Sequence, residues 1–138
     1  MADRVRKINY TYVKVPHRPG KGIEVLGALR EAGVNLTAFS AFPAGGGKAQ
    51  VDLVTDDLPG LRKVARRNGW RLKPVKRGFL VQGDDRIGAV HRVLAKLASA
   101  RINAVAADAV TAGRGRYGMI LWVRPKDFSR AARALGAR

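Results

Sequence analysis

The residues of this sequence that could hold a small ligand lie at the start and the end of a helical pattern. The turn at residues 18–20 leads into a helix, where the first backbone N–H groups have no partner and the helix dipole favours a negative charge. A carboxylate would suit that position. Asn35, beyond the helix, carries a donor and an acceptor and could fix an amino or a carboxyl group. The alternatives are structural: Gly20 permits a tight backbone, Asn35 caps a loop, and Arg18 is a surface charge.

The sequence contains few residues that could catalyse a reaction or bind a metal ion. The chain has no cysteine and two histidines, His17 and His91, and no metal-ligand spacing, so we expect no metal site and no thiol nucleophile. Glycines 45–47 join two strand patterns and precede no helix, which favours a hairpin loop over a phosphate-binding loop. The acidic pairs at 56–57 and 84–85 precede helices, where capping explains them. No nucleophile, base and orienting group can be assembled, which predicts a protein without catalytic activity or cofactor.

The pattern of turn, helix and asparagine occurs twice in the sequence. At a constant offset of 68 residues, the second half repeats the first without a gap from Val13 to Leu121. The matched pairs include Val13 and Val81, Arg18 and Arg86, Gly20 and Gly88, Leu29 and Leu97, Asn35 and Asn103, and Leu53 and Leu121. Because chance does not maintain register over such a length, the sequence predicts a duplicated unit.

Each copy predicts the same set of elements to position these residues. Residues 8–15 and 78–83 are rich in β-formers, and a helix with one apolar stripe follows each of them. Two strands around a glycine loop and a second helix come next, and residues 70–75 supply a last strand. The order βαββαβ predicts an α+β fold of two ferredoxin-like modules in tandem, with antiparallel sheets that carry helices on one face.

The boundaries of the two modules follow from the repeat. We expect a first module at residues 1–76 and a second at 77–138, which lacks its last strand because little chain follows Leu135. Residues 78–83 would then form an unpaired edge. Either residues 3–9 or the same edge of a second copy could cover it, and the gain from burying more surface predicts a homodimer.

Composition indicates the environment and the possible partners. Lys and Arg number 27 against 10 acidic residues, a net charge of +17, and 46% of the residues are hydrophobic. The charge would attract nucleic acid, anionic metabolites or acidic proteins, and it also fits a solvated surface of Arg-rich composition. No apolar run is long enough for a membrane span and no signal-peptide pattern is present, so we expect a cytoplasmic protein that does not bind membranes.

The stretches HRPGKGIEVLGALREAGVNL (17–36) and DDRIGAVHRVLAKLASARIN (84–103) resemble the ACT domain, a small ligand-sensing module of amino-acid metabolism. With their flanking strands and helices, the two resembling segments cover almost the whole chain. Ile87 stands where the family usually has Pro, and His17 stands where it often has Asp or Asn. Asp85 keeps the acidic residue in the second copy.

The resemblance implies a non-catalytic regulatory protein with two ACT-like modules. Such a protein would bind an amino acid or a similar small carboxylate between modules, and would act alone or on an enzyme that the sequence does not identify. The positions that the resemblance implies for ligand binding are His17, Arg18, Gly20, Asn35, Asp85, Arg86, Gly88 and Asn103.

An RNA-binding protein is the alternative from another functional class. The RNA recognition motif shares the βαββαβ order, and Tyr117 and Gly118 fit the pattern of its third strand. Met119 replaces the second aromatic residue, and Arg116 replaces the expected glycine. Since RNA binding by that motif depends on bases stacking on those rings, the aromatic residues favour the ACT interpretation.

Overall fold

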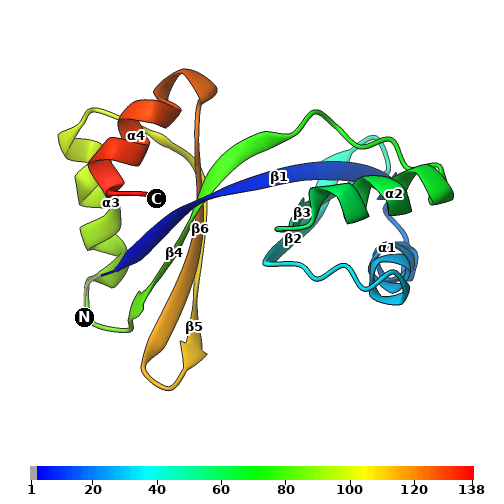
Figure 1. Cartoon of the computed structure of the whole chain (residues 1–138), viewed down its shortest axis with the longest axis horizontal. Helices are drawn as coiled ribbons and strands as arrows, with labels where there is room; N and C mark the ends of the chain where they lie inside the picture. The colour runs from blue at the N-terminus through cyan, green and yellow to red at the C-terminus, as the bar shows by residue number, and fades with distance from the viewer. Residues whose placement is uncertain (1–2) are drawn as a thin grey trace. The chain divides into compact units, whose positions relative to one another are not determined.

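The chain has an α+β fold, seen in a computed structural model that describes residues 3–138 (Figure 1). Six strands form an antiparallel sheet in the hydrogen-bonded order β2-β3-β1-β4-β6-β5. The strands are β1 (Arg4–Pro16), β2 (Ala38–Gly45), β3 (Lys48–Val54), β4 (Lys76–Asp84), β5 (Ala104–Gly113) and β6 (Arg116–Val123). The four α-helices of the described residues are α1 (Lys21–Glu31), α2 (Leu58–Asn68), α3 (Ala89–Ser99) and α4 (Phe128–Leu135). No helix within residues 3–138 combines the length and apolar character that crossing a bilayer requires.

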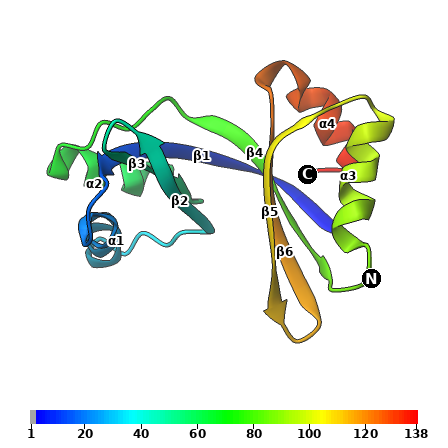
Figure 2. The same ribbon diagram turned by 180° about the vertical axis from the view of Figure 1, so that it is seen from behind.

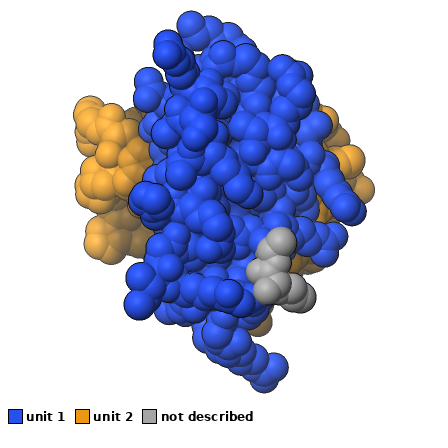
Figure 3. Space-filling model, turned by 90° about the vertical axis from the view of Figure 1, so that its left-hand side faces the viewer, with its two compact units in different colours: residues 1–8, 77–138 blue, residues 9–76 orange. Residues whose placement is uncertain are grey.

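The described chain divides into two compact units, which Figure 3 colours separately. One is Asn9–Lys76, called the 9–76 unit. The other, called the 77–138 unit, is Arg77–Arg138 together with the N-terminal segment up to Ile8. Strand β1 runs through both units, so its first and last residues serve different cores.

The core of the 9–76 unit forms because strand alternation and helical periodicity agree. Successive strand residues face opposite sides, which sends Val13 of β1 and Val51 of β3 to the same side, where they lie directly opposite each other. The helices α1 and α2 contribute one apolar stripe each. The buried residues of this core are Val13, Val25, Leu29, Val34, Val51, Leu53, Leu61 and Val64. Asp57 caps α2 as predicted, because its carboxylate accepts a hydrogen bond from the Gly60 N–H at 3.0 Å.

In the 77–138 unit, α3 and α4 lie side by side on one face of β4 and β6 (Figures 1 and 2). The Phe79 ring of β4 stacks on the Phe128 ring of α4, with ring centroids 4.7 Å apart. The Arg77 guanidinium lies 3.9 Å from the Phe128 ring centroid and closes this cluster on its outer side. The predicted apolar stripe of α4 is confirmed, since Phe128, Ala131, Ala132 and Leu135 are all buried.

Strand register confirms the predicted repeat of 68 residues. In the 9–76 unit Val13 pairs with Val51, and in the 77–138 unit Val81 pairs with Met119, which lie 68 residues further along. Burial follows the same offset. Buried pairs include Val25 and Val93, Leu29 and Leu97, Val34 and Ile102, and Leu53 and Leu121. The two copies therefore place equivalent residues in equivalent core positions.

The N-terminal residues of β1 cover the edge that the sequence left open. Strand β4 has β6 on one side and β1 on the other, so residues 78–83 have no free edge. Val5 of β1 is 6% exposed and belongs to the core of the 77–138 unit. Arg138 reinforces the position, because its N–H donates to the Val5 carbonyl and its carbonyl accepts from the Lys7 N–H, both at 3.1 Å. Of the two predicted occupants, the segment donated within the chain lies there.

Two local predictions differ from the structure. Residues 70–75 form no regular strand, although the Lys73 N–H donates to the Tyr12 carbonyl at 3.0 Å and the Thr11 hydroxyl donates to the Lys73 carbonyl. Pro74 has no N–H and interrupts the ladder there, and regular pairing begins at Lys76. Asp127 precedes α4 without capping it by a side-chain hydrogen bond, and forms ion pairs with arginines instead.

Candidate ligand-binding groove beside helix α3

The turn between β4 and α3 exposes the N-terminus of a helix. Gly88 is the N-cap residue, and its φ of 81° is a left-handed conformation that favours glycine. The turn is held by its own backbone, since the Asp85 N–H donates to the Gly115 carbonyl at 2.8 Å and the Ala89 N–H donates to the Arg86 carbonyl at 3.0 Å. Within residues 3–138, no side chain caps the helix. The first turn of α3 therefore offers N–H groups and a positive dipole end to an anion.

A groove of about 290 Å³ opens beside this turn. The turn and the first residues of α3 form one wall, and β5 with β6 forms the other. The lining residues are Asp85, Arg86, Gly88, Ala89, Val90, His91, Ala109, Val110, Thr111 and Tyr117. The groove thus combines one carboxylate, one guanidinium, one imidazole and one aliphatic hydroxyl with an uncapped helix N-terminus. A zwitterion with a carboxylate and an ammonium group fits this set of charges and donors.

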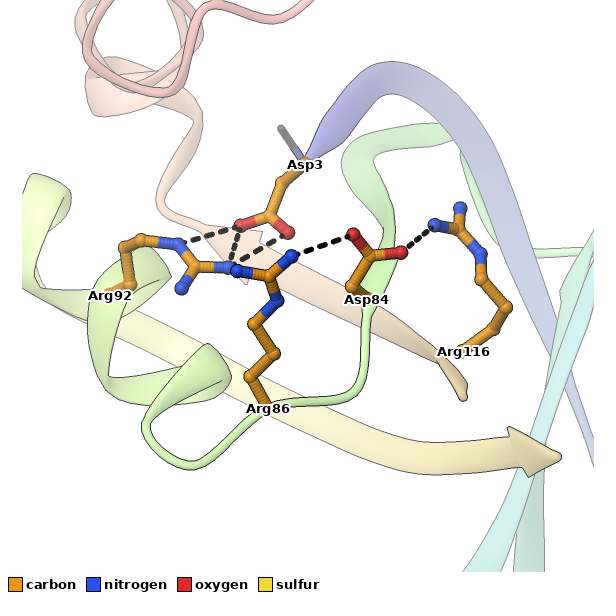
Figure 4. Close-up of polar contacts among 5 residues, drawn as sticks. All are labelled: Asp3, Asp84, Arg86, Arg92 and Arg116. Atoms are coloured by element: carbon orange, nitrogen blue, oxygen red, sulfur yellow. Dashed lines mark hydrogen bonds and ion pairs between the residues drawn. The ribbon is translucent and has the colours of Figure 1, made fainter. Parts of the chain in front are cut away.

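Two arginines flank the start of the turn and share one carboxylate (Figure 4). Arg116 donates to Asp84 at 2.8 Å, and Arg86 reaches the same carboxylate at 3.5 Å. Of these two arginines, Arg116 makes the shorter contact to Asp84. The Arg86 side chain, 63% exposed, is the one of the two arginines that lines the groove.

The groove floor depends on the N-terminal segment. The Asp3 side chain is 3% exposed, and Arg92 of α3 donates to it at 3.2 to 3.3 Å (Figure 4). Burial, and then the negative charge of Asp3, raise the pKa of Tyr117 to about 12, so this phenol stays neutral at physiological pH. Gly83 is required beneath the contact, because a Cβ there would collide with the Asp3 carboxylate. Asp3, directly before β1, therefore meets residues of β4, α3 and β6 beside the groove.

The equivalent turn of the 9–76 unit repeats this backbone geometry. Gly20 has a φ of 91° and is the N-cap of α1, again without a side-chain cap. The hydrogen bonds match those of the other turn at the offset of 68: His17 N–H donates to the Gly47 carbonyl at 2.9 Å, and Lys21 N–H donates to the Arg18 carbonyl at 3.3 Å. The predicted residues His17, Arg18 and Gly20 thus lie together in one exposed turn.

The two predicted asparagines lie at the other ends of the helices. Helices α1 and α3 have 11 residues each, a length of about 16 Å that separates each turn from the asparagine of its own unit. Asn35 lines a hollow of about 430 Å³ near the end of α1, and its carbonyl accepts from the Thr55 hydroxyl at 2.8 Å. Asn103 is exposed and is absent from the lining of the α3 groove.

The structure therefore brings some predicted site residues together and separates others. Asp85, Arg86 and Gly88 share one groove. His91, Thr111 and Tyr117 also line this groove, and the sequence did not predict them as site residues. Thr111 and Tyr117 carry no local signal of this role, because only the pairing of β5 with β6 brings them to the turn.

The alternative of a base-stacking sheet conflicts with the burial of Tyr117. This ring is 5% exposed and packs in the core with Met119, which is 2% exposed. Both residues lie on the face of β6 that the helices cover, so neither ring nor thioether is available to a base. RNA binding through an RRM-like Tyr117 is thus excluded by its position.

Comparison with known proteins identifies structural neighbours. No protein-family model matches the sequence, and no curated protein matches it significantly. The Bacteroides thetaiotaomicron protein BT0572 shares 16% identity with a TM-score of 0.77, over 97% of this chain and 88% of that chain. The ligand-free regulatory subunit of aspartate kinase from Thermus thermophilus shares 15% identity with a TM-score of 0.66, over 98% of this chain and 93% of that chain. Aspartate kinase from Synechocystis shares 15% identity with a TM-score of 0.61, over 97% of this chain and 25% of that chain.

At these identities the likeness establishes the fold. Nearly the whole chain aligns with nearly the whole Thermus thermophilus regulatory subunit, whereas it corresponds to a quarter of the Synechocystis kinase chain. The chain has the fold of the regulatory subunits of aspartate kinase.

Proposed function

We propose that this chain is a non-catalytic regulatory protein that binds an amino acid or a similar small carboxylate. The observation that carries the proposal is the match along almost its full length to a separate regulatory subunit of aspartate kinase. In this proposal the chain consists of two ferredoxin-like, ACT-like modules in tandem, near residues 1–76 and 77–138, with the start of β1 serving as the last strand of the second module. The equal strand register of the two units supports it.

The proposed ligand site is the groove beside α3. The helix N-terminus and Arg86 would receive the carboxylate, and Asp85 would receive an ammonium group. The matching turn at His17, Arg18 and Gly20 is the second candidate. Asn35 and Asn103 are proposed only for a ligand at the opposite helix ends. In this proposal, binding of the ligand to this chain changes the activity of a partner enzyme. The residues of this chain do not identify that enzyme.

A thermal-shift screen of the twenty amino acids tests this proposal. A ligand present at a hundred times its Kd adds roughly 2.7 kcal/mol to the unfolding free energy, which raises the melting temperature by several degrees. We expect one or a few amino acids to do so. Replacement of Ala109 by Trp fills the groove from β5 and should remove the shift.

Two further variants locate the site. Ala106→Trp adds the same ring to β5 outside the groove lining and should keep the shift. The double variant Asn35→Ala, Asn103→Ala should also keep it. A shift that survives Ala109→Trp but disappears in the asparagine variant would move the ligand to the helix ends, and a chain that responds to no amino acid would contradict the sensing proposal.

We also propose that the protein is a homodimer in which β5 contacts a second copy. All ten residues of β5 are exposed, with Val105 at 62% and Val110 at 68%, and the strand ends the sheet order. A long apolar edge strand of this kind favours pairing.

Light scattering at micromolar concentration should give twice the chain mass, and the double variant Val105→Lys, Val110→Lys should give the monomer mass. Ile23→Lys, at an exposed position of α1, should leave the dimer intact, and a monomeric wild type would refute the assignment.

A further inference from the structure

One helix of the 9–76 unit has a solvent face that is mostly cationic. Helix α2 buries its apolar stripe of Leu61, Val64 and Ala65 in the core. Its exposed face carries four basic residues, called the basic face: Arg62, Lys63, Arg66 and Arg67. The four positions span five residue steps, about 7.5 Å along the helix axis. Four positive charges are therefore held close together on a rigid element.

The basic face has no acidic partner to compensate it. No Asp or Glu occurs from residue 58 to residue 76, and within residues 3–138 none of the four basic side chains forms an ion pair. Arg62 and Arg66, and likewise Lys63 and Arg67, are four residues apart, where like charges repel and destabilise a helix. Its neighbour α1 differs, because Lys21 pairs with Glu24 at 3.4 Å.

We propose that the basic face of α2 binds the phosphate backbone of duplex nucleic acid without reading base sequence. Duplex DNA carries one negative charge per about 1.7 Å of its axis, which matches four cations within one and a half helical turns. Three of the four residues are arginines, whose planar guanidinium groups suit phosphate oxygens. No aromatic side chain accompanies them on α2, so contacts to the backbone are available and base stacking is not.

Other anionic partners fit this face less well. A protein partner needs apolar or aromatic anchors at the centre of its interface, and the apolar residues of α2 are buried in its own unit. An interfacial membrane helix inserts an apolar face into the lipid, and that face is again occupied by the core. This surface is separate from the groove beside α3, and the proposal does not depend on ligand sensing.

The test measures binding of a fluorescein-labelled 20-base-pair DNA of arbitrary sequence by anisotropy between 50 and 200 mM NaCl. Four phosphate contacts predict that log K falls with log salt with a slope of about −3.6 or steeper. This slope corresponds to a loss of about 150-fold in affinity over this range. In the variant R62Q/K63Q/R66Q/R67Q the slope should become shallower by about 3.6, with more than tenfold weaker binding at 50 mM.

Matched variants separate this face from the net charge. The variant K14Q/K48Q/K96Q/R133Q removes four exposed charges elsewhere and lowers the net charge by the same amount, from +17 to +13, yet it should keep the wild-type slope. The charge-conserving variant R62K/R66K/R67K should also keep the slope, which controls for damage to α2. Equal slopes in the two glutamine variants, or a wild type that binds no DNA at 50 mM, would overturn the proposal. Loss of binding to phosphatidylserine vesicles with unchanged DNA binding would overturn it too, and would assign the face to membranes.

Discussion

Replacement of Val5 by Asp is expected to destabilise the 77–138 unit selectively, by about 3–5 kcal/mol. Val5 is 6% exposed and packs with residues of β4, β6 and the two helices of that unit. A carboxylate there has no cationic partner in the core, so it is buried uncompensated or pulls the strand away. Because folded domains are stable by only about 5–15 kcal/mol, the loss removes much of the stability of a unit of this size.

Hydrogen exchange of backbone amides measures this effect unit by unit. Loss of the β1 segment leaves β4 with a free edge, so amides of β4 and β6 should exchange faster, while those of β3 and α2 remain protected. Asn9→Asp is the matched control, since it introduces the same charge at an exposed position of the same strand. Equal protection of β4 in the Val5 variant and the control would mean that the N-terminal segment does not hold the second unit together.

The second large effect is expected from a pair of substitutions related by the repeat. Leu53 and Leu121 are both 0% exposed and occupy equivalent positions of β3 and β6. Leucine-to-alanine changes at such sites cost about 2.7–5 kcal/mol, because transfer energy is lost and a cavity remains. We expect Leu53→Ala to destabilise the 9–76 unit and Leu121→Ala to destabilise the 77–138 unit, by similar amounts.

Urea denaturation measures the loss of unfolding free energy in each variant. Hydrogen exchange of backbone amides then shows which of the two units has lost protection. The controls are Ile23→Ala and Ile87→Ala, which replace exposed side chains of the two units outside β5 and should change stability by less than about 0.5 kcal/mol. If either buried substitution left its own unit unaffected, the structural equivalence of the two copies would be lost at that position.

Local pattern was sufficient wherever a residue's environment depends on its own element. The stripes of α2 and α4, the cap at Asp57 and the hairpin at glycines 45–47 were predicted correctly, because helical periodicity, capping and turn chemistry act within a few residues. The repeat of 68 residues extended this further: a shared pattern implied a shared register, and the strand pairs Val13–Val51 and Val81–Met119 agree with it.

Prediction was weaker where a residue's role depends on distant backbone. Asp127 stands at a helix start like Asp57, yet it pairs with Arg124 and Arg130 after a short 3₁₀ turn. Residues 70–75 have strand-forming composition, but the missing N–H of Pro74 outweighs it. A ligand at the asparagines stays a prediction: within one unit a helix of about 16 Å separates Asn35 from Gly20, so a ligand that touches both kinds of residue has to lie between modules.

Periodicity and the repeat of 68 residues were enough to predict an α+β unit that occurs twice, the buried stripes of α2 and α4, and a glycine turn before the first helix of each copy. These properties follow from periodicity and short-range backbone chemistry. Ala32, Val90 and Ala98, which the periodicity also assigns to apolar stripes, are exposed. Two other features come from long-range pairing: residues 4–8 complete the sheet of the 77–138 unit, and β5 and Tyr117 line a groove with Asp85 and Arg86. The reason is that pairing between strands far apart in sequence depends on which unpaired edge the chain can reach, and no local pattern records that choice.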